Sequence, residues 1–150
     1  MSKPILDQIN LVCGDTAASV AFYRRLGVEI PDDRIWSTAT CAHHIGAADE
    51  SADKAIAFDL DSTAFAQKWN PSWKGRTDLA GRFVLGFRVA ARTDVDDLYR
   101  DMTSAGYRGL REPHDAFWGA RYAIIEDPDG IAVGLMSPVS PDKKSPPPEV

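Results

Sequence analysis

The sequence predicts an α+β fold built from two βαβββ modules. Three observations support this prediction. The order of strand, capped helix, glycine and three short strands occurs twice in the chain. The second copy starts about 80 residues after the first, and two copies are too few for a solenoid. With 44% hydrophobic residues among 150, the chain can bury one shared core.

Module one is expected over residues 5–60. Its first strand lies in "ILDQINLVC", where apolar Ile9 and Leu11 alternate with polar Gln8 and Asn10. One face of this strand therefore suits packing against a helix, and the other suits a wetter environment. The segment "DTAASVAFYRRLG" then predicts a helix with N-cap residues at its start and a glycine at its end. Three shorter strands are expected near residues 33–38, 41–47 and 54–60.

Module two is expected over residues 82–138 and repeats this order. Its first strand alternates two sets of side chains, which are Leu85, Phe87 and Val89 on one face and Val84, Gly86 and Arg88 on the other. The segment "TDVDDLYRDMTSAG" predicts a capped helix that ends at a glycine. The segments "YRGLRE", "FWGARYAIIED" and "IAVGLM" predict the three remaining strands.

Two further segments complete the organisation of a single domain over residues 1–140. Residues 61–81 form a longer connection that holds a possible helical turn and two tryptophans. Connections of this length in compact domains are usually functional or mobile. Residues 139–150 are rich in proline and have no apolar period, so they are expected to form a disordered tail.

Charge and composition narrow the choice of partners. The chain has 17 basic and 22 acidic residues and a net charge of −5. It therefore lacks the positive charge that nucleic acid or an anionic membrane surface attracts, and neither is an expected partner. The start of the chain has no apolar signal region and no long apolar run follows, so we expect a cytoplasmic protein.

Two motifs give the chain a resemblance to a known family. "FYRRLGVEIP" follows the first strand, and "EDPDGIAVGLM" lies near the end of module two. Together with the paired modules, they resemble the vicinal oxygen chelate superfamily over about residues 5–138. The resemblance implies the glyoxalase/bleomycin resistance fold, in which each module forms a U-shaped mixed sheet. It also implies a homodimer, with clefts lined by the sheet faces opposite the helices.

The resemblance also identifies where metal-using members place their ligands, on the first and fourth strands of each module. Carried over by strand register, these positions are Gln8, Phe58, Val84 and Gly134. Only Gln8 has a donor atom, whereas a divalent ion needs about three or four protein ligands. We therefore expect neither a metal site nor another cofactor.

The metal-free members that this leaves are drug-binding proteins, including bleomycin and mitomycin resistance proteins. The stretch "WGARYAI" followed by "DPDG" is most similar to the mitomycin-binding members. This resemblance implies metal-independent binding of a planar antibiotic or related small metabolite, which would confer resistance by sequestration.

Aromatic side chains are the first candidates for contact with a planar, aromatic small molecule, because a flat ligand can stack on their rings. Trp118 is the leading candidate, expected at the start of a strand and beside Gly119; the alternative is a tryptophan in the core. The other aromatic candidates are Trp36, Phe58, Trp69, Trp73, Phe117 and Tyr122.

Several of these candidates have a structural alternative. Trp36 faces the cleft in only one of two strand registers. Trp69 and Trp73 lie in the connection, where they would cover the ligand or pack against a partner subunit. Phe58 occupies a metal-ligand position and would form an apolar floor, or belong to the core.

Polar candidates complete the expected site. Arg88 would hold a carbonyl or acidic group or stack on a ring, unless it forms a salt bridge within the sheet. Gln8 and Asn10 would orient a polar ligand, or bind water at a dimer seam. His43 and His44 are adjacent on a strand and point to opposite faces, so at most one serves the cleft. We favour His43, with a surface histidine as the alternative.

The sequence therefore predicts a binding protein, and two other functions stay open. One is a lyase or isomerase of the same fold that recruits a metal through Gln8 and His43 or uses acid–base chemistry alone. Asp59 and Asp115 are the first acidic residues to test for that chemistry. The other is a structural protein whose tryptophans pack a dimer.

Overall fold

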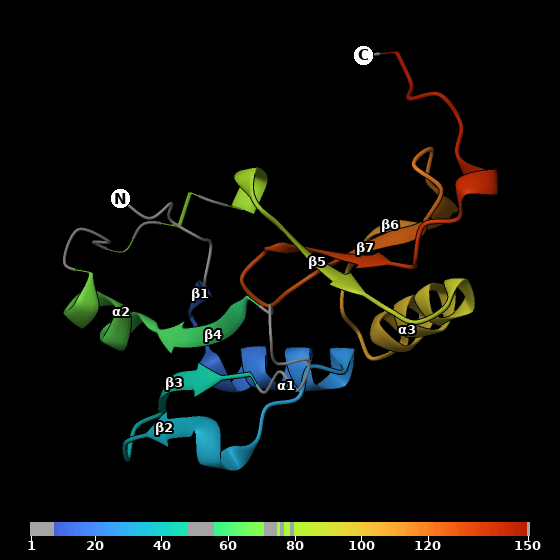
Figure 1. The fold of residues 1–150 in the computed structure, drawn as a ribbon. Helices are drawn as coiled ribbons and strands as arrows, with labels where there is room; N and C mark the ends of the chain where they lie inside the picture. The colour runs from blue at the N-terminus through green and yellow to red at the C-terminus, as the bar shows by residue number, and fades with distance from the viewer. Residues whose placement is uncertain (1–7, 48–55, 71–74, 76, 79, 150) are drawn as a thin grey trace, which may run out of the picture. The chain divides into compact units, whose positions relative to one another are not determined.

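The computed structural model describes residues 8–47, 56–70, 75, 77, 78 and 80–149. The chain divides into two compact units, Met1–Thr77 (unit 1) and Asp78–Val150 (unit 2). Each unit contains one βαβββ module with a four-stranded mixed sheet (Figure 1). The α+β class and the two repeated modules predicted from the sequence are therefore confirmed.

Unit 1 has the sheet order β1-β4-β3-β2, in which β1 and β4 are parallel and the other pairs are antiparallel. A short second helix follows the last strand. The elements are β1 (Gln8–Cys13), α1 (Thr16–Leu26), η1 (Asp32–Arg34), β2 (Ile35–Ser37), β3 (Ala42–Gly46), β4 (Ala57–Ser62) and α2 (Thr63–Trp69).

Local sequence sets both ends of α1. The Asp15 carboxylate accepts a hydrogen bond from the Ala18 backbone N–H at 3.0 Å, which caps the first turn. The helix ends at Gly27, whose φ of 104° lies in the left-handed region that favours glycine. Phe22 and Tyr23 are fully buried between this helix and the sheet. The helix thereby covers one face of the sheet of unit 1 and leaves the other face for function.

Unit 2 repeats the topology with the sheet order β5-β8-β7-β6. Leu85, Val133 and Ile125 form a buried row across this sheet, and Val95 and Met102 of its long helix are fully buried. The elements are η2 (Ala80–Arg82), β5 (Val84–Arg88), α3 (Arg92–Ser104), β6 (Gly109–Asp115), β7 (Arg121–Glu126), β8 (Ala132–Met136) and η3 (Pro141–Lys143).

The proline-rich tail has more structure than the sequence suggested. The Ser140 backbone N–H donates to the carbonyl of Gly119 at 2.9 Å, and the Ser145 N–H donates to the carbonyl of Phe117 at 2.9 Å. These bonds attach the tail to the turn between β6 and β7. The expected disorder from residue 139 stays a prediction; these bonds show that backbone groups at residues 140 and 145 have partners although the segment has no apolar period of its own.

No helix in the part of the chain that the structure describes is long and apolar enough to cross a membrane.

Candidate functional site

Within each sheet, strand pairing shows which side chains lie next to one another on the face opposite the long helix, α1 in unit 1 and α3 in unit 2. Paired residues on neighbouring strands point to the same face, so each sheet carries a row of four side chains across it. These rows are Val12, Asp61, His44 and Trp36 in unit 1, and Arg88, Met136, Tyr122 and His114 in unit 2.

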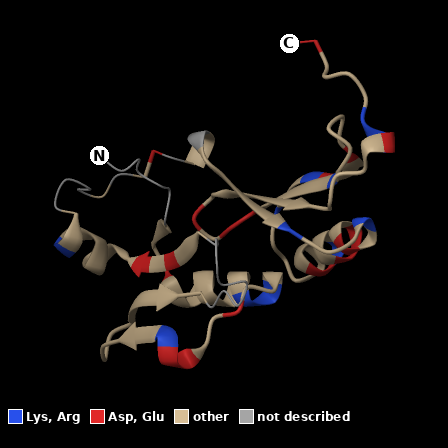
Figure 2. Cartoon of the chain, in the orientation of Figure 1, with Lys and Arg blue, Asp and Glu red and all other residues tan. Residues whose placement is uncertain are grey.

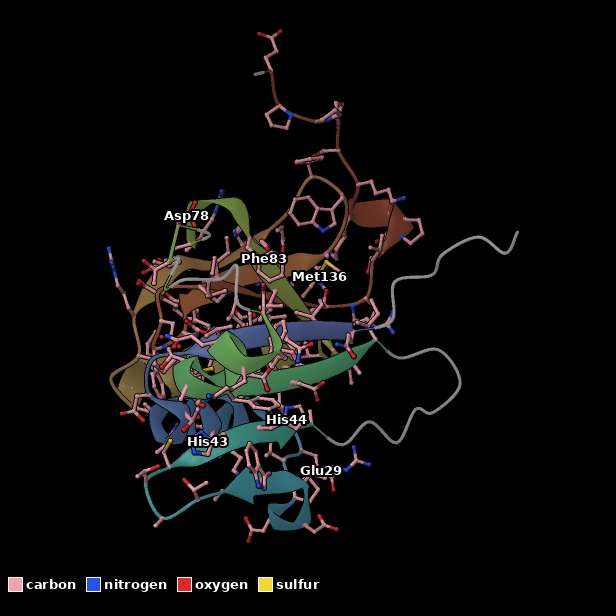
Figure 3. The ribbon with its side chains drawn as sticks, turned by 90° about the vertical axis from the view of Figure 1, so that its left-hand side faces the viewer. Glu29, His43, His44, Asp78, Phe83 and Met136 are labelled. Atoms are coloured by element: carbon pink, nitrogen blue, oxygen red, sulfur yellow. The ribbon has the colours of Figure 1, made fainter. Side chains whose placement is uncertain are left out.

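In unit 2 this face carries a pocket of about 380 Å³, which we call the aromatic pocket. The ring centroids of Trp118 and Tyr122 lie 5.2 Å apart at an interplanar angle of 70°, so the two rings meet edge to face. Arg88 is exposed and, among the described residues, forms no ion pair. The lining residues are Val84, Gly86, Phe87, Arg88, Trp118, Tyr122 and Met136 (Met136 is labelled in Figure 3).

Trp118 lies in the turn between β6 and β7 rather than at the start of a strand, as the sequence suggested. The backbone N–H of Ala116 donates to the carbonyl of Ala120 at 2.8 Å, which closes this turn. Gly119 has a φ of 96°, and its carbonyl accepts a hydrogen bond from Arg92 Nη1 at 3.1 Å. Helix α3 and the tail therefore both anchor the turn that presents the indole.

Tyr122 fills the space above Gly134, one of the positions where metal-using members place a ligand. A Cβ added to Gly134 would lie 2.9 Å from Cε2 and 3.0 Å from Cζ of the Tyr122 ring, closer than ordinary contacts. Burial raises the pKa of the Tyr122 phenol. The phenol therefore stays protonated over a wide pH range and can donate a hydrogen bond.

A second pocket of about 430 Å³ lies on the same unit and shares Trp118 and Tyr122 with the first. Phe117 lines it and meets Trp118 edge to face, with ring centroids 5.0 Å apart. Ser145 and Pro146 of the tail line it as well. The predicted residues Trp118, Tyr122, Phe117 and Arg88 are thus brought together in unit 2.

Unit 1 presents a different surface, which we call the polar face: Gln8, Asn10, His44, Asp59 and Asp61. Gln8 Nε2 donates to Asn10 Oδ1 at 2.9 Å, and Asn10 Nδ2 donates to Asp61 Oδ2 at 2.9 Å. His44 Nδ1 lies 2.5 Å from Asp61 Oδ1. The Asp61 side chain is fully buried, and the acidic stretch of β4 is coloured red in Figure 2. The predicted residues Gln8 and Asn10 therefore belong to a connected hydrogen-bond network.

Asp59 lies next to this network on β4. Burial raises the pKa of its carboxyl group, and the neighbouring Asp61 raises it further, whereas His44 and Arg34 lower it. The net effect is a raised pKa, which favours the protonated form of Asp59 more than in a free aspartate.

Phe58 does not face the cleft, and this expectation from the sequence is wrong. Its register partner is Ile9, and its ring lies 5.1 Å from that of Tyr23 on α1, on the helix-covered face. The residue of β4 that corresponds to Gly134 of β8 in unit 2 is instead Asp59, two residues before Asp61 just as Gly134 is two residues before Met136. The error has a simple cause: a shift of one residue in a strand moves every side chain to the opposite face.

The two adjacent histidines of β3, His43 and His44, make different contacts (Figure 3). His43 Nε2 lies 2.8 Å from Thr38 Oγ1, and His43 Nδ1 lies 2.8 Å from Ser62 Oγ. The His43 ring also lies 5.2 Å from that of Trp36. His44 belongs to the polar face. The sequence analysis did not select His44 or Asp61 as site residues. The stretch "AFDLDS" did contain a signal for Asp61: its apolar Phe58 and Leu60 alternate with Asp59 and Asp61, which places the two aspartates on the polar side of the strand.

Two of the remaining tryptophans, Trp36 and Trp69, belong to the described part of unit 1. Trp36 is 52% exposed and pairs with His44 across the strands of unit 1. Trp69 ends α2 and is also exposed. Trp73 lies outside the described residues.

The residues present do not fit the metal that the fold family implies. By strand register the four family positions hold Gln8, Asp59, Val84 and Gly134, of which only the first two have donor atoms. In the described part of the chain, no three His, Cys, Asp or Glu side chains gather where they could hold an ion. This donor set falls short of the three or four ligands that a divalent ion needs.

Solved structures with the same fold support this architecture. A glyoxalase/bleomycin resistance protein/dioxygenase family enzyme from Burkholderia phytofirmans has a TM-score of 0.71 at 17% identity, with 88% of this chain and 97% of that one covered. A glyoxalase-related enzyme from Fulvimarina pelagi gives 0.69 at 21% identity, with 92% and 94% covered. A lactoylglutathione lyase from Agrobacterium tumefaciens gives 0.63 at 16% identity, with 91% and 95% covered. At these identities the likeness concerns the fold alone.

Comparison with curated proteins gives no match. The sequence profile of the Glyoxalase/Bleomycin resistance protein/Dioxygenase superfamily, however, matches residues 5–135, which is most of the chain. The protein therefore belongs to the glyoxalase/bleomycin resistance/dioxygenase superfamily.

Proposed function

We propose that this protein is a metal-independent binding protein that sequesters a planar antibiotic or a related small metabolite and so confers resistance. The observation that carries the proposal is the aromatic pocket of unit 2, where Trp118 and Tyr122 form a wall beside Met136. Its volume of about 380 Å³ lies within the range of small-molecule sites.

The chemistry of the pocket supports a flat ligand with polar substituents. Indole and phenol rings stack on planar molecules, and each aromatic contact adds about 0.5–1.5 kcal/mol beyond the burial of apolar area. The Arg88 guanidinium has no ion-pair partner among the described residues and can bind a carbonyl or an acidic group of the ligand. The Tyr122 ring lies against the position where a side chain at residue 134 would start, which supports binding without a metal at that position.

Intrinsic tryptophan fluorescence of metal-stripped protein, titrated with planar antibiotics, tests the proposal. Mitomycin and bleomycin are included because of the sequence resemblance. We expect saturable quenching, its loss in Trp118→Ala, and recovery of the drug unchanged. Trp69→Ala is the matched control, because Trp69 is an exposed indole of unit 1. Quenching that needs added zinc, nickel or manganese, or that survives in Trp118→Ala, contradicts the proposal.

An enzyme of the same fold, a lyase or isomerase with an unusual or absent metal site, is the second candidate. The polar face favours it, since Asp59 has a raised pKa and lies beside the His44–Asp61 pair. Conversion of the bound ligand, followed by chromatography, separates the two candidates: an enzyme yields a new product, whereas a sequestering protein returns the ligand unchanged.

The proposal extends to a cytoplasmic location and a homodimer. The first follows from composition and the second from the family resemblance, so both stay predictions. Size-exclusion chromatography with light scattering tests the dimer directly.

A further inference from the structure

The polar face of unit 1 contains an oriented imidazole that the proposed binding site in unit 2 does not use. His44 lies on β3 between Trp36 on β2 and Asp61 on β4, and all three share one row of the sheet. Its side chain is 39% exposed, so one edge of the ring is accessible.

Asp61 fixes which nitrogen of His44 carries the proton. A carboxylate offers only acceptor atoms, and Asp61 Oδ2 already accepts from Asn10 Nδ2 at 2.9 Å. The remaining oxygen, Oδ1, lies 2.5 Å from His44 Nδ1, so Nδ1 must donate. In the neutral ring the lone pair is then on Nε2, for which no hydrogen-bond partner exists among the described residues.

Two aromatic side chains lie near this acceptor. The Phe65 ring of α2 lies 5.6 Å from that of His44. Trp36 is the strand partner of His44, and its ring lies 5.4 Å from that of Phe65 and 5.2 Å from that of His43. Trp36 is 52% exposed, so much of its indole is accessible to a ligand. An exposed indole beside an oriented hydrogen-bond acceptor has the composition of a small ligand site.

We propose that His44, Trp36 and Phe65 form a second binding site, which takes an aromatic ligand bearing a hydroxyl group. The ligand ring packs on Trp36, and its O–H donates a hydrogen bond to His44 Nε2. Asp61 acts as a positioning residue, because it holds the imidazole as an acceptor. This site lies within unit 1 and does not depend on the proposed function of the aromatic pocket.

The matched pair 2-naphthol and 2-methoxynaphthalene tests this inference. The two probes have the same fused rings, but only the naphthol can donate a hydrogen bond. Binding is followed in the full-length protein by NMR, through the Trp36 indole N–H and the His44 ring signals. We expect the naphthol to bind about tenfold more tightly than its methyl ether, as for a well-formed hydrogen bond.

Asp61→Asn is the most informative variant. Its amide can donate to Nδ1, which moves the ring proton to Nε2 and turns the acceptor into a donor, the change known from the aspartate of serine protease triads. We expect the preference for the naphthol to disappear while the rings still bind. The double variant His44→Phe/Asp61→Asn removes the imidazole without leaving a buried carboxylate unpaired, and it should give the same loss.

Two controls separate this site from the others. His114→Gln changes a histidine of unit 2, and Trp118→Ala changes the aromatic pocket. Both should keep the tenfold preference. Equal binding of the two probes by the wild type overturns the inference, as does a preference that survives in the double variant. If the preference is lost only in Trp118→Ala, the naphthol binds to unit 2. That result also overturns the inference of a second site, and it leaves the proposed function of the aromatic pocket intact.

Discussion

The polar face of unit 1 and the aromatic pocket of unit 2 occupy equivalent positions on sheets of the same topology. Where unit 1 has the buried Asp61 and its partner His44, unit 2 has Met136 and Tyr122. In unit 1 these positions carry a hydrogen-bond network, whereas in unit 2 they carry the thioether of Met136 and the phenol ring of Tyr122. The repeated backbone thus determines where side chains point, whereas their chemistry has diverged.

The same comparison applies to the four strand positions where metal-using members of the family place a ligand. The equivalent positions on the fourth strands are Asp59 and Gly134, and the first strands offer Gln8 and Val84. Unit 1 keeps oxygen donors at its two positions, while unit 2 has none and covers Gly134 with the Tyr122 ring. Unit 2 therefore contributes no donor atom at these two positions.

The largest effect is expected when the network of unit 1 is broken at its centre. Asp61→Ala leaves the Nδ2 of Asn10 and the Nδ1 of His44 without their shared acceptor. Each unsatisfied group costs about 1–3 kcal/mol, so the two groups together should lower the free energy of unfolding by about 2–6 kcal/mol. Urea denaturation measures it. A loss below about 1 kcal/mol would show that the network contributes little.

A smaller effect is expected in unit 2 when a methyl group is added under Tyr122. Gly134→Ala places a Cβ against the Tyr122 ring and should cost about 1–3 kcal/mol by overpacking. Gly86→Ala is the matched control, because its register partner is Gly134 and its own Cβ would meet nothing within 4 Å.

A double-mutant cycle sharpens this prediction. Adding Tyr122→Ala removes the ring, so the cost of Gly134→Ala should largely disappear in its presence. Equal costs for Gly134→Ala with and without Tyr122 would contradict the view that this ring occupies the missing ligand's space.

The smallest effect concerns Asp59. The pKa of Asp59 is higher in the folded protein than its value near 3.8 in the unfolded chain. At neutral pH the carboxyl group is ionised, and its ionisation lowers the free energy of unfolding. Below the unfolded pKa the group is protonated in both states, so this loss of stability disappears. Asp59→Asn should therefore stabilise the protein by about 0.5 kcal/mol or less at neutral pH. The gain should vanish as the pH falls below the unfolded pKa. A gain that grows in acid would contradict the raised pKa.

Much of the fold follows from local sequence rules. The alternation of Leu85 with Val84 and Gly86 gives the correct buried and open faces of β5, and Asp15 and Gly27 mark the ends of α1. These signals are readable because each depends on neighbouring residues only.

The site is less predictable, because it depends on strand register. The fourth strand of module one was expected at 54–60 but spans Ala57–Ser62, and its face was misassigned by one residue, which placed Phe58 where Asp59 lies. His43 and His44 are adjacent, so only the pairing of His44 with Asp61 shows which one joins the polar face. Trp118 was correctly grouped with Tyr122, because these residues are close in sequence.

Chemical-shift mapping by ¹⁵N–¹H NMR tests the central claim most directly. Metal-stripped protein is titrated with the planar antibiotic that quenches tryptophan fluorescence most strongly. If unit 2 has become an aromatic binding surface, the largest shifts will fall on Trp118, Tyr122 and the β5 residues around Arg88, with no metal added. Shifts confined to the polar face of unit 1, or seen only after a divalent metal is restored, would contradict the account.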